Sequence, residues 1–286
     1  MSVFTTKLAA SSEASRSLLC VGIDPDPKLA PPSVVAQPDW VARFALGIVE
    51  ATADLACAFK PNLAFFEALG DDGYRGLRAL MAALPKDRLS IGDAKRGDVG
   101  STAAAYARAL FEVWGFDAAT VNPYLGWDSL EPFLGYQDRG TIVLCKTSNP
   151  GSGDLQDLRT TWEGRDMPLY QVVARQAVGR NGARNLGLVV GATYPQQLAH
   201  VRELAPDMPI LVPGVGTQQG DLEAAVAAGL DVQGGGILVN ASRSVIYAST
   251  GDDWQAVARA AALDLRDRVN AVRQAERAEE RVGTTG

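Results

Sequence analysis

The stretch Ile91-Gly-Asp-Ala-Lys-Arg-Gly-Asp-Val-Gly-Ser-Thr102 marks the point where a β-branched, strand-like run gives way to a segment of helical periodicity. It places Asp93, Lys95 and Asp98 within six positions of one another. Side chains alternate faces along a strand, so we expect Asp93 and Lys95 to point the same way. The chain contains a single histidine. Two carboxylates around one ammonium therefore indicate that a lysine does the proton chemistry.

Short apolar runs like the one that ends at Asp93 recur along the chain, separated by alanine-rich segments of helical periodicity. Strands that alternate with helices predict a parallel sheet, and eight of them close a (β/α)8 or TIM barrel. An open doubly wound sheet is the competing α/β fold, but no strand is followed by a Gly-x-Gly-x-x-Gly turn. The predicted strands are Leu18–Ile23, Cys57–Lys60, Leu89–Asp93, Ala118–Asn122, Thr141–Lys146, Leu186–Val190, Ile210–Pro213 and Gly236–Asn240. The predicted helices are Asp39–Ala56, Tyr74–Leu84, Thr102–Trp114, Leu169–Asn181, Pro195–Leu204 and Asp221–Ala228.

The length of the chain fits one barrel. It has 286 residues, and a single α/β barrel commonly occupies about 250. We expect residues 1–286 to form one TIM-barrel domain with an N-terminal extension over 1–16 and a frayed tail over 276–286. A long Gly-, Ser- and Asp-rich loop over 147–165 follows the fifth strand, and this position favours a functional lid.

Charge and hydropathy exclude several classes of protein. A net charge of −6 argues against a nucleic-acid binder, which needs clustered Lys and Arg. No uncharged apolar run approaches the ~20 residues of a membrane helix, and the first twenty residues lack a signal-peptide pattern. Cys20, Cys57 and Cys145 have neither metal-ligand spacing nor an even count, and the sequence shows no acidic pattern for a metal. We expect buried, reduced thiols in a cytoplasmic protein without a metal site.

Polar residues collect where the predicted strands end, and in a TIM barrel the active site lies at those carboxyl ends. Any one of them could simply be a solvent-exposed polar residue at the start of a loop. Together they would place at least two lysines and three aspartates in one mouth. They are Asp24 and Asp26 after the first strand, Lys60 and Asn62 after the second, Asp93 and Lys95 after the third, Asn122 and Tyr124 after the fourth, and Lys146, Ser148 and Asn149 after the fifth.

The last two strands carry the pattern of a phosphate site. A glycine-rich turn, Val212-Pro-Gly-Val-Gly-Thr-Gln-Gln-Gly220, follows the seventh strand, and Ser242-Arg-Ser244 follows the eighth. Glycines let backbone N–H groups approach an anion, and loops after strands seven and eight often bind phosphate in TIM barrels. A glycine turn alone can be merely a tight turn. Arg243, whose guanidinium suits bidentate phosphate binding, favours the phosphate site.

These motifs together resemble the orotidine 5′-phosphate decarboxylase family. The resemblance covers the first strand through the eighth and leaves out the N-terminal tail, the long loop and the C-terminal end. The form Asp-Ala-Lys-Arg-Gly-Asp with Asn122-Pro-Tyr124 is similar to the longer bacterial branch of the family. The motifs are Asp93-x-Lys95-x-x-Asp98, Lys60, Asp24, the Pro213-Gly-Val-Gly216 loop and Ser242-Arg243-Ser244.

The resemblance implies an activity and a site. The implied reaction converts orotidine 5′-phosphate to UMP and CO2, the last step of de novo UMP (pyrimidine) biosynthesis, in a homodimer that needs no cofactor or metal. Lys60, Asp93, Lys95 and Asp98 match the charged network around the reacting carbon. Lys95 matches the proton donor, and Asp98 reaches the neighbouring subunit's site. The remaining matches are Asp24 and Thr102 for the ribose, Thr102 from the partner subunit, Ser148 for the pyrimidine, and Gln218 and Arg243 for the phosphate, with the register between Gln218 and Gln219 left open.

Physical chemistry favours the same reaction. Loss of CO2 from C6 leaves a carbanion in the ring plane, which a fixed ammonium can stabilise and then protonate. Asp93 and Asp98 would keep Lys95 charged and aimed.

Two alternative functions compete with this decarboxylation. Related sugar-phosphate decarboxylases and epimerases usually hold Mg²⁺ through an extra acidic residue, where this chain has Arg96-Gly97. A non-catalytic phosphate-binding barrel would not need the charged network.

Overall fold

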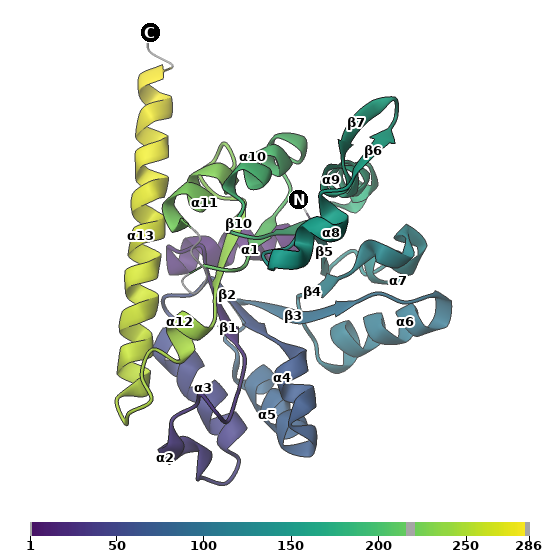
Figure 1. The fold of residues 1–286 in the computed structure, drawn as a ribbon. Helices are drawn as coiled ribbons and strands as arrows, with labels where there is room; N and C mark the ends of the chain where they lie inside the picture. The colour runs from purple at the N-terminus through teal and green to yellow at the C-terminus, as the bar shows by residue number, and fades with distance from the viewer. Residues whose placement is uncertain (1, 216–220, 284–286) are drawn as a thin grey trace.

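Eight parallel strands close into a barrel in the computed structural model, which describes residues 2–215 and 221–283 (Figure 1). The order around the barrel is β1-β10-β9-β8-β5-β4-β3-β2, so the predicted TIM barrel is confirmed. Outside it, β6 (Arg159–Trp162) and β7 (Arg165–Pro168) form an antiparallel hairpin. The barrel strands are β1 (Leu19–Ile23), β2 (Ala58–Pro61), β3 (Leu89–Arg96), β4 (Ala118–Val121), β5 (Gly140–Lys146), β8 (Leu186–Val190), β9 (Ile210–Val212) and β10 (Ile237–Ala241).

Helices surround the barrel between successive strands (Figure 1). Each predicted helix is present within a few residues of its expected bounds, although the third changes to a π-helical turn, η1 (Ala109–Val113). The α-helices are α1 (Val3–Ser15), α2 (Pro32–Val35), α3 (Trp40–Thr52), α4 (Leu63–Ala68), α5 (Gly70–Ala83), α6 (Gly100–Arg108), α7 (Glu131–Leu134), α8 (Gly153–Gln156), α9 (Leu169–Arg180), α10 (Pro195–Leu204), α11 (Leu222–Gly229), α12 (Arg243–Ile246) and α13 (Trp254–Gly283). The 3-10 turns are η2 (Pro123–Leu125), η3 (Trp127–Ser129), η4 (Pro150–Ser152) and η5 (Asn181–Ala183).

The N-terminal extension is an ordered helix that closes the amino-terminal end of the barrel. Ser2 begins α1 with a capping box to Thr5, which satisfies N–H groups that a helix start leaves unpaired. Phe4 and Leu8 of α1 are buried against the apolar side chains inside the barrel. A Cβ on Gly140 would lie 2.6 Å from the Phe4 ring, so this close approach requires glycine. The extension therefore seals the end of the barrel away from the strand-end residues.

The long loop predicted after β5 contains short regular elements. Residues 147–165 include η4, α8 and β6, and the β6–β7 hairpin projects from the barrel wall (Figure 1). An ion pair between Arg159 and Asp166 joins the two strands of the hairpin. The sequence predicted a long loop here, and the structure builds this connection from these short elements. Its role as a lid stays a prediction.

The C-terminal helix α13 runs alongside the outer layer of helices (Figure 1). Arg259 of α13 forms an ion pair with Asp54 after α3, and Gln255 donates to the Gly47 carbonyl oxygen. The helix continues to Gly283, beyond residue 276, where the sequence predicted fraying. No helix among residues 2–215 and 221–283 is long and apolar enough to cross a membrane. Cys20, Cys57 and Cys145 are free and buried, as predicted.

Candidate active site

The inside of the barrel changes from apolar to polar along the strands. Inward positions recur every second residue, and at the amino-terminal end they are filled by an apolar cluster. Two residues further along the same strands, the buried side chains become polar. The pairs of inward residues on one strand, the apolar one first, are Ala58 and Lys60, Ile91 and Asp93, Ala118 and Thr120, and Leu238 and Asn240. The polar layer therefore lies at the carboxyl end of the barrel, where the sequence predicted the mouth.

Asp93 lies between two ammonium groups. Lys60 Nζ is 2.6 Å from Asp93 Oδ2, and Lys95 Nζ is 2.5 Å from Asp93 Oδ1. The Lys60 side chain is almost fully buried, whereas the Lys95 side chain is 49% exposed. The structure thus brings together three of the four predicted catalytic residues. Of the two lysines, Lys95 is the one that a ligand can reach from the mouth.

The strand that carries Lys95 is not regular. Between the pairs Gly92↔Ala119 and Arg96↔Val121, β3 advances by four residues while β4 advances by two. This bulge gives Lys95 a φ of 49°, a left-handed backbone that costs a non-glycine residue about 1–2 kcal/mol. Asp93 and Lys95 do meet, as predicted, but the bulge and not simple alternation sets the direction of Lys95.

Thr120 holds this bulge, a role that was not predicted from the sequence. Its Oγ1 accepts hydrogen bonds from the backbone N–H groups of Ala94 and Lys95, each at 3.0 Å. The same hydroxyl donates to Asp93 Oδ1 at 2.9 Å. Thr120 therefore replaces ladder partners that the bulge removes and fixes the carboxylate between the lysines. A lone hydroxyl inside the apolar run Ala118–Val121 is the signal that could have identified it.

Opposite charges dominate the electrostatics of the buried cluster. Burial would raise the pKa of Asp93, but the ammonium groups of Lys60 and Lys95 outweigh it and hold that pKa well below its usual range. Burial would lower the pKa of Lys60, and the carboxylates of Asp93 and Asp24 instead raise it above its usual range. For Asp24, burial prevails over the attraction of Lys60 and raises the pKa of its carboxyl group. The cluster thus keeps charge inside the protein near the mouth.

A small pocket of about 160 Å³ lies beside the charged cluster. Two buried acceptors in it, Asp24 Oδ1 and Asn240 Oδ1, have no hydrogen-bond partner in the described part of the chain. Buried acceptors without partners are costly, so this pair suits a ligand that brings hydroxyl donors. Asn240, on the inward side of β10, was not predicted as a site residue. The pocket is lined by Asp24, Ser148, Gly214, Val215, Asn240, Ser242 and Arg243.

Tyr247 fixes the loop that carries Asp24. Its hydroxyl donates to the Asp24 carbonyl oxygen at 2.5 Å and accepts from the Asp26 N–H at 2.7 Å. The Tyr247 ring stacks on Phe44 of α3, with 5.4 Å between the ring centroids. A residue beyond β10 therefore positions the strand-end loop after β1, on the adjacent strand of the barrel.

Two predicted residues stand apart from the cluster within one chain. Asp98 Oδ1 accepts a hydrogen bond from the Val99 N–H at 2.7 Å, and no ion pair involving Asp98 occurs among the described residues. Thr102 lies exposed on α6. Gln218, predicted to contact phosphate, lies outside the described residues, whereas Arg243 is exposed at the start of α12 on the pocket rim.

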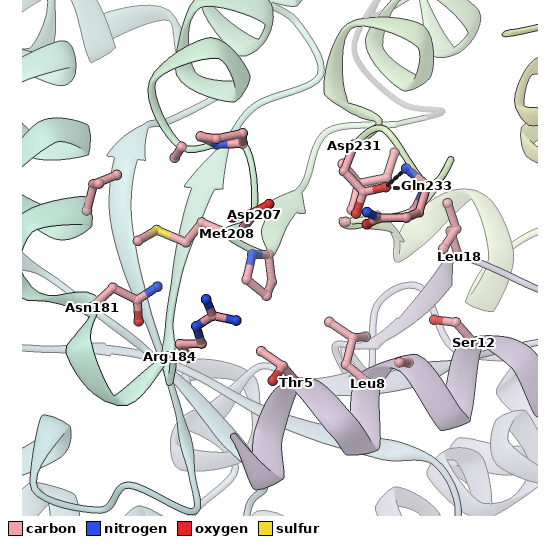
Figure 2. A pocket seen from close by; sticks show the side chains of 18 of the residues that line it. Thr5, Leu8, Ser12, Leu18, Asn181, Arg184, Asp207, Met208, Asp231 and Gln233 are labelled. Atoms are coloured by element: carbon pink, nitrogen blue, oxygen red, sulfur yellow. Dashed lines mark hydrogen bonds between the residues drawn. The ribbon is translucent and has the colours of Figure 1, made fainter. Parts of the chain in front are cut away.

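A larger cavity, of about 790 Å³, lies at the opposite end of the barrel (Figure 2). It is bounded by α1 and by the turns that precede β8, β9 and β10, with Leu8 on one side and Asp231 and Gln233 across from it (Figure 2). None of the predicted site residues lines this cavity. No group of three or more metal-ligand side chains occurs within residues 2–215 and 221–283.

The chain is similar to known proteins of one family. The orotidine 5′-phosphate decarboxylase / HUMPS family matches residues 17–261. The orotidine 5′-phosphate decarboxylase of Roseiflexus sp. (strain RS-1) is 51% identical over 269 residues, covering 94% of this chain and 97% of that protein. The protein of the same name from Azoarcus sp. (strain BH72) is 50% identical over 272 residues, covering 94% and 99%. The structure of Leishmania donovani OMP decarboxylase is 41% identical with a TM-score of 0.82, covering 96% of this chain and 99% of that chain.

Proposed function

Because the chain belongs to the orotidine 5′-phosphate decarboxylase / HUMPS family, we propose that it converts orotidine 5′-phosphate to UMP and CO2, the last step of UMP biosynthesis. The observation that carries the proposal is the Lys60–Asp93–Lys95 chain of ion pairs. It holds one buried and one accessible ammonium at the mouth of a barrel that also contains a polar pocket. Incubation of the purified protein with orotidine 5′-phosphate tests it. UMP and CO2 formed in equal amounts support it, and absence of conversion overturns it.

The proposed chemistry needs no cofactor. The bond between C6 and the carboxylate carbon breaks, CO2 leaves, and the electron pair stays on C6 in the plane of the ring. The Lys95 ammonium stabilises this charge and then transfers a proton to C6, which gives UMP. The neutral Lys95 amine regains a proton from water. Because Asp93 and Lys60 are fixed before the reaction, the field at C6 requires little reorganisation in the transition state.

The pocket residues bind the rest of the substrate in this proposal. Asp24 accepts hydrogen bonds from ribose hydroxyls, for which its unpartnered Oδ1 is available. Ser148, which lines the same pocket, contacts the pyrimidine. Arg243, with Gln218, binds the phosphate. Binding energy from the phosphate, remote from C6, can then help to organise the reacting end.

We propose a homodimer in which Asp98 and Thr102 complete the partner subunit's site. Within a single subunit neither residue reaches the linked ion pairs of Lys60, Asp93 and Lys95, which supports a role in trans. The segments that follow β3 and β4 also expose large apolar side chains, and exposed apolar patches often mark protein interfaces. The exposed residues on these segments are Val99, Tyr106, Tyr124 and Leu125.

Subunit mixing tests the shared site. Lys95→Ala and Asp98→Ala proteins should each be inactive, and their mixture should recover activity because each heterodimer contains one intact site. Random exchange of subunits makes about half of the dimers mixed, so activity should reach about a quarter of the wild-type value. Mass spectrometry of differently labelled subunits verifies the exchange. Exchange without recovered activity would contradict the contribution of Asp98 in trans.

Chelation separates this reaction from the magnesium-dependent alternative. Turnover of orotidine 5′-phosphate should be unchanged after treatment with EDTA, because Arg96 and Gly97 occupy the gap between Lys95 and Asp98. Arg96 forms an ion pair with Glu67 and lies over the Tyr106 ring, so its guanidinium is engaged away from a metal. Activity lost with EDTA and restored by Mg²⁺ would contradict the prediction. The non-catalytic alternative predicts that the protein binds orotidine 5′-phosphate without converting it to UMP.

We also propose a cytoplasmic location. The three cysteines are free and buried, and unpaired thiols suit a reducing compartment. Cell fractionation followed by detection of the protein tests this placement, and recovery outside the cytoplasmic fraction contradicts it.

A further inference from the structure

Lys146, the last residue of β5, is fully buried and lies outside the chain of ion pairs described above. Its Nζ donates to Asp157 Oδ2 at 2.7 Å and to Ser152 Oγ at 3.1 Å. The same nitrogen lies 4.5 Å from the centre of the Tyr194 ring. Both polar partners belong to the segment that leaves the barrel after β5. The connection from β5 to α9, residues 147–168, is called the crossover segment below. The buried ammonium at the mouth is therefore neutralised by the crossover segment and not by a barrel strand.

The exposure of the two partners is unequal. The Lys146 side chain is 0% exposed, whereas that of Asp157 is 46% exposed. A buried charge that loses its partner is strongly unfavourable, because it is left without either water or a counter-charge. Movement of Asp157 away from the barrel would leave Lys146 in that state. The end of α8 is accordingly held against the end of β5.

A second pair of hydrogen bonds acts at the next residue. The Thr147 N–H donates to Gln156 Oε1 at 2.9 Å, and Gln156 Nε2 donates to Thr147 Oγ1 at 2.8 Å. Consecutive residues at the end of β5 are thus joined to consecutive residues at the end of α8. This arrangement fixes the start of the crossover segment immediately before Ser148.

Ser148 follows these two anchored residues and has little freedom of its own. A Cβ on Gly191 would lie 2.7 Å from Ser148 Cα, and one on Gly214 would lie 3.2 Å from Ser148 Cβ. Ser148 is therefore packed between the loops that follow β8 and β9. It also lines the small pocket together with Asp24 and Arg243. The position of this pocket wall depends on how the end of β5 is held.

We propose that Lys146 and Asp157 are positioning residues that hold Ser148 in place for substrate binding. The proposal rests on the proposed function, because Ser148 is assigned there to the pyrimidine. Neither residue contacts Lys95, Asp93 or Lys60 in the ion pairs formed by the described chain. Loss of the Lys146–Asp157 pair should therefore weaken binding of the substrate and leave the chemical step nearly unchanged.

The Asp157→Ala variant is the first test. We expect KM for orotidine 5′-phosphate to rise by about tenfold and kcat to stay within about threefold of the wild type. Backbone amides of residues 147–157 should exchange with deuterium faster, because the segment loses its anchor. Asp157→Glu keeps the charge on a half-exposed side chain and should restore most of the wild-type KM.

Lys146→Met separates positioning from simple stability. Methionine removes the buried charge, so this variant should unfold at a higher temperature than Asp157→Ala. Its KM should nevertheless be raised by about tenfold, because the anchor is absent in both variants. If the Lys146–Asp157 pair served stability alone, KM would be raised only in the less stable variant. The KM of Lys146→Met would then return toward the wild-type value. That result would overturn the proposal.

Asp166→Ala is the matched control. It removes an aspartate from the Arg159–Asp166 ion pair of the same crossover segment, where both side chains are exposed. KM should stay at the wild-type value. Unchanged KM in both Asp157→Ala and Lys146→Met, or a fall in kcat alone, overturns the positioning role. If the wild-type protein does not convert orotidine 5′-phosphate, the proposed function fails on its own. Hydrogen–deuterium exchange then still tests the anchoring, because an unchanged exchange rate of residues 147–157 in Asp157→Ala would overturn it.

Discussion

Replacement of Lys95 by alanine should reduce kcat/KM for orotidine 5′-phosphate by at least about 10⁴-fold, because it removes both the electrostatic stabiliser and the general acid. The fold should persist, since the Lys95 side chain is half-exposed and its loss leaves Asp93 paired with Lys60. Formation of UMP measures the loss of activity. Circular dichroism and thermal unfolding verify that the variant is folded.

Lys86→Ala is the control for Lys95→Ala. Lys86 is an exposed lysine in the turn that precedes β3, at the amino-terminal end of the barrel and away from the mouth. Its removal changes the net charge by the same amount and should leave turnover at the wild-type level. Turnover in Lys95→Ala within about tenfold of the wild type would contradict the proton-donor role, because a general acid typically contributes 10²–10⁴-fold.

Replacement of Asp93 by alanine should affect both activity and stability. It leaves the Lys60 ammonium buried without its nearest counter-charge and lowers the free energy of unfolding by about 3 kcal/mol. It also frees Lys95 from the carboxylate that orients it, so kcat should fall by at least about 10²-fold. Denaturant unfolding and the turnover assay measure the two effects on the same protein.

A double variant separates the two effects of Asp93. In Lys60→Met/Asp93→Leu both buried charges are removed together, so most of the lost stability should return. Activity should stay as low as in Asp93→Ala, because apolar side chains cannot hold or stabilise charge at C6. Stability that does not recover in the double variant would show that packing, and not the unpaired ammonium, accounts for the loss in the single variant.

The contribution of the Asp93–Lys60 pair to stability should depend on pH. The pKa of Asp93 is lowered on folding, so its contribution is present above its unfolded pKa of about 4 and is lost as the pH falls further. The pKa of Lys60 is raised on folding, so its contribution is present below about pH 10 and is lost as the pH rises further. The difference in unfolding free energy between the wild type and Asp93→Ala should therefore be constant between about pH 5 and 9 and decrease outside that range.

The alternation that identifies the barrel is local, and the sequence carries it in full. Eight apolar runs separated by helical segments predicted the strands, because a strand of a parallel barrel is buried on both faces and therefore reads as a short continuous apolar run. Asp24, Lys60, Asp93 and Lys95 stand at or just after the ends of their apolar runs, which placed them at the carboxyl ends of the strands. Their common location followed from strand direction alone.

The contacts that fix the site join residues far apart in the sequence, and only the closed barrel decides them. Thr120 holds Asp93 and the bulge at Lys95 because β4 lies beside β3 with a shifted register, which local periodicity does not contain. Tyr247 reaches the loop after β1 because β10 closes the barrel against β1.

By itself the sequence determined the fold and the residue types gathered at the mouth, since both depend on patterns within single strands. The tertiary structure alone decided which of those residues meet. It joined Lys60 and Lys95 through Asp93 and left Asp98 apart from them in one chain. It also gave Lys146 a partner, Asp157, from the crossover segment. The physical reason is that a buried charge must find its counter-charge in space, and distance in space is set by how the barrel closes.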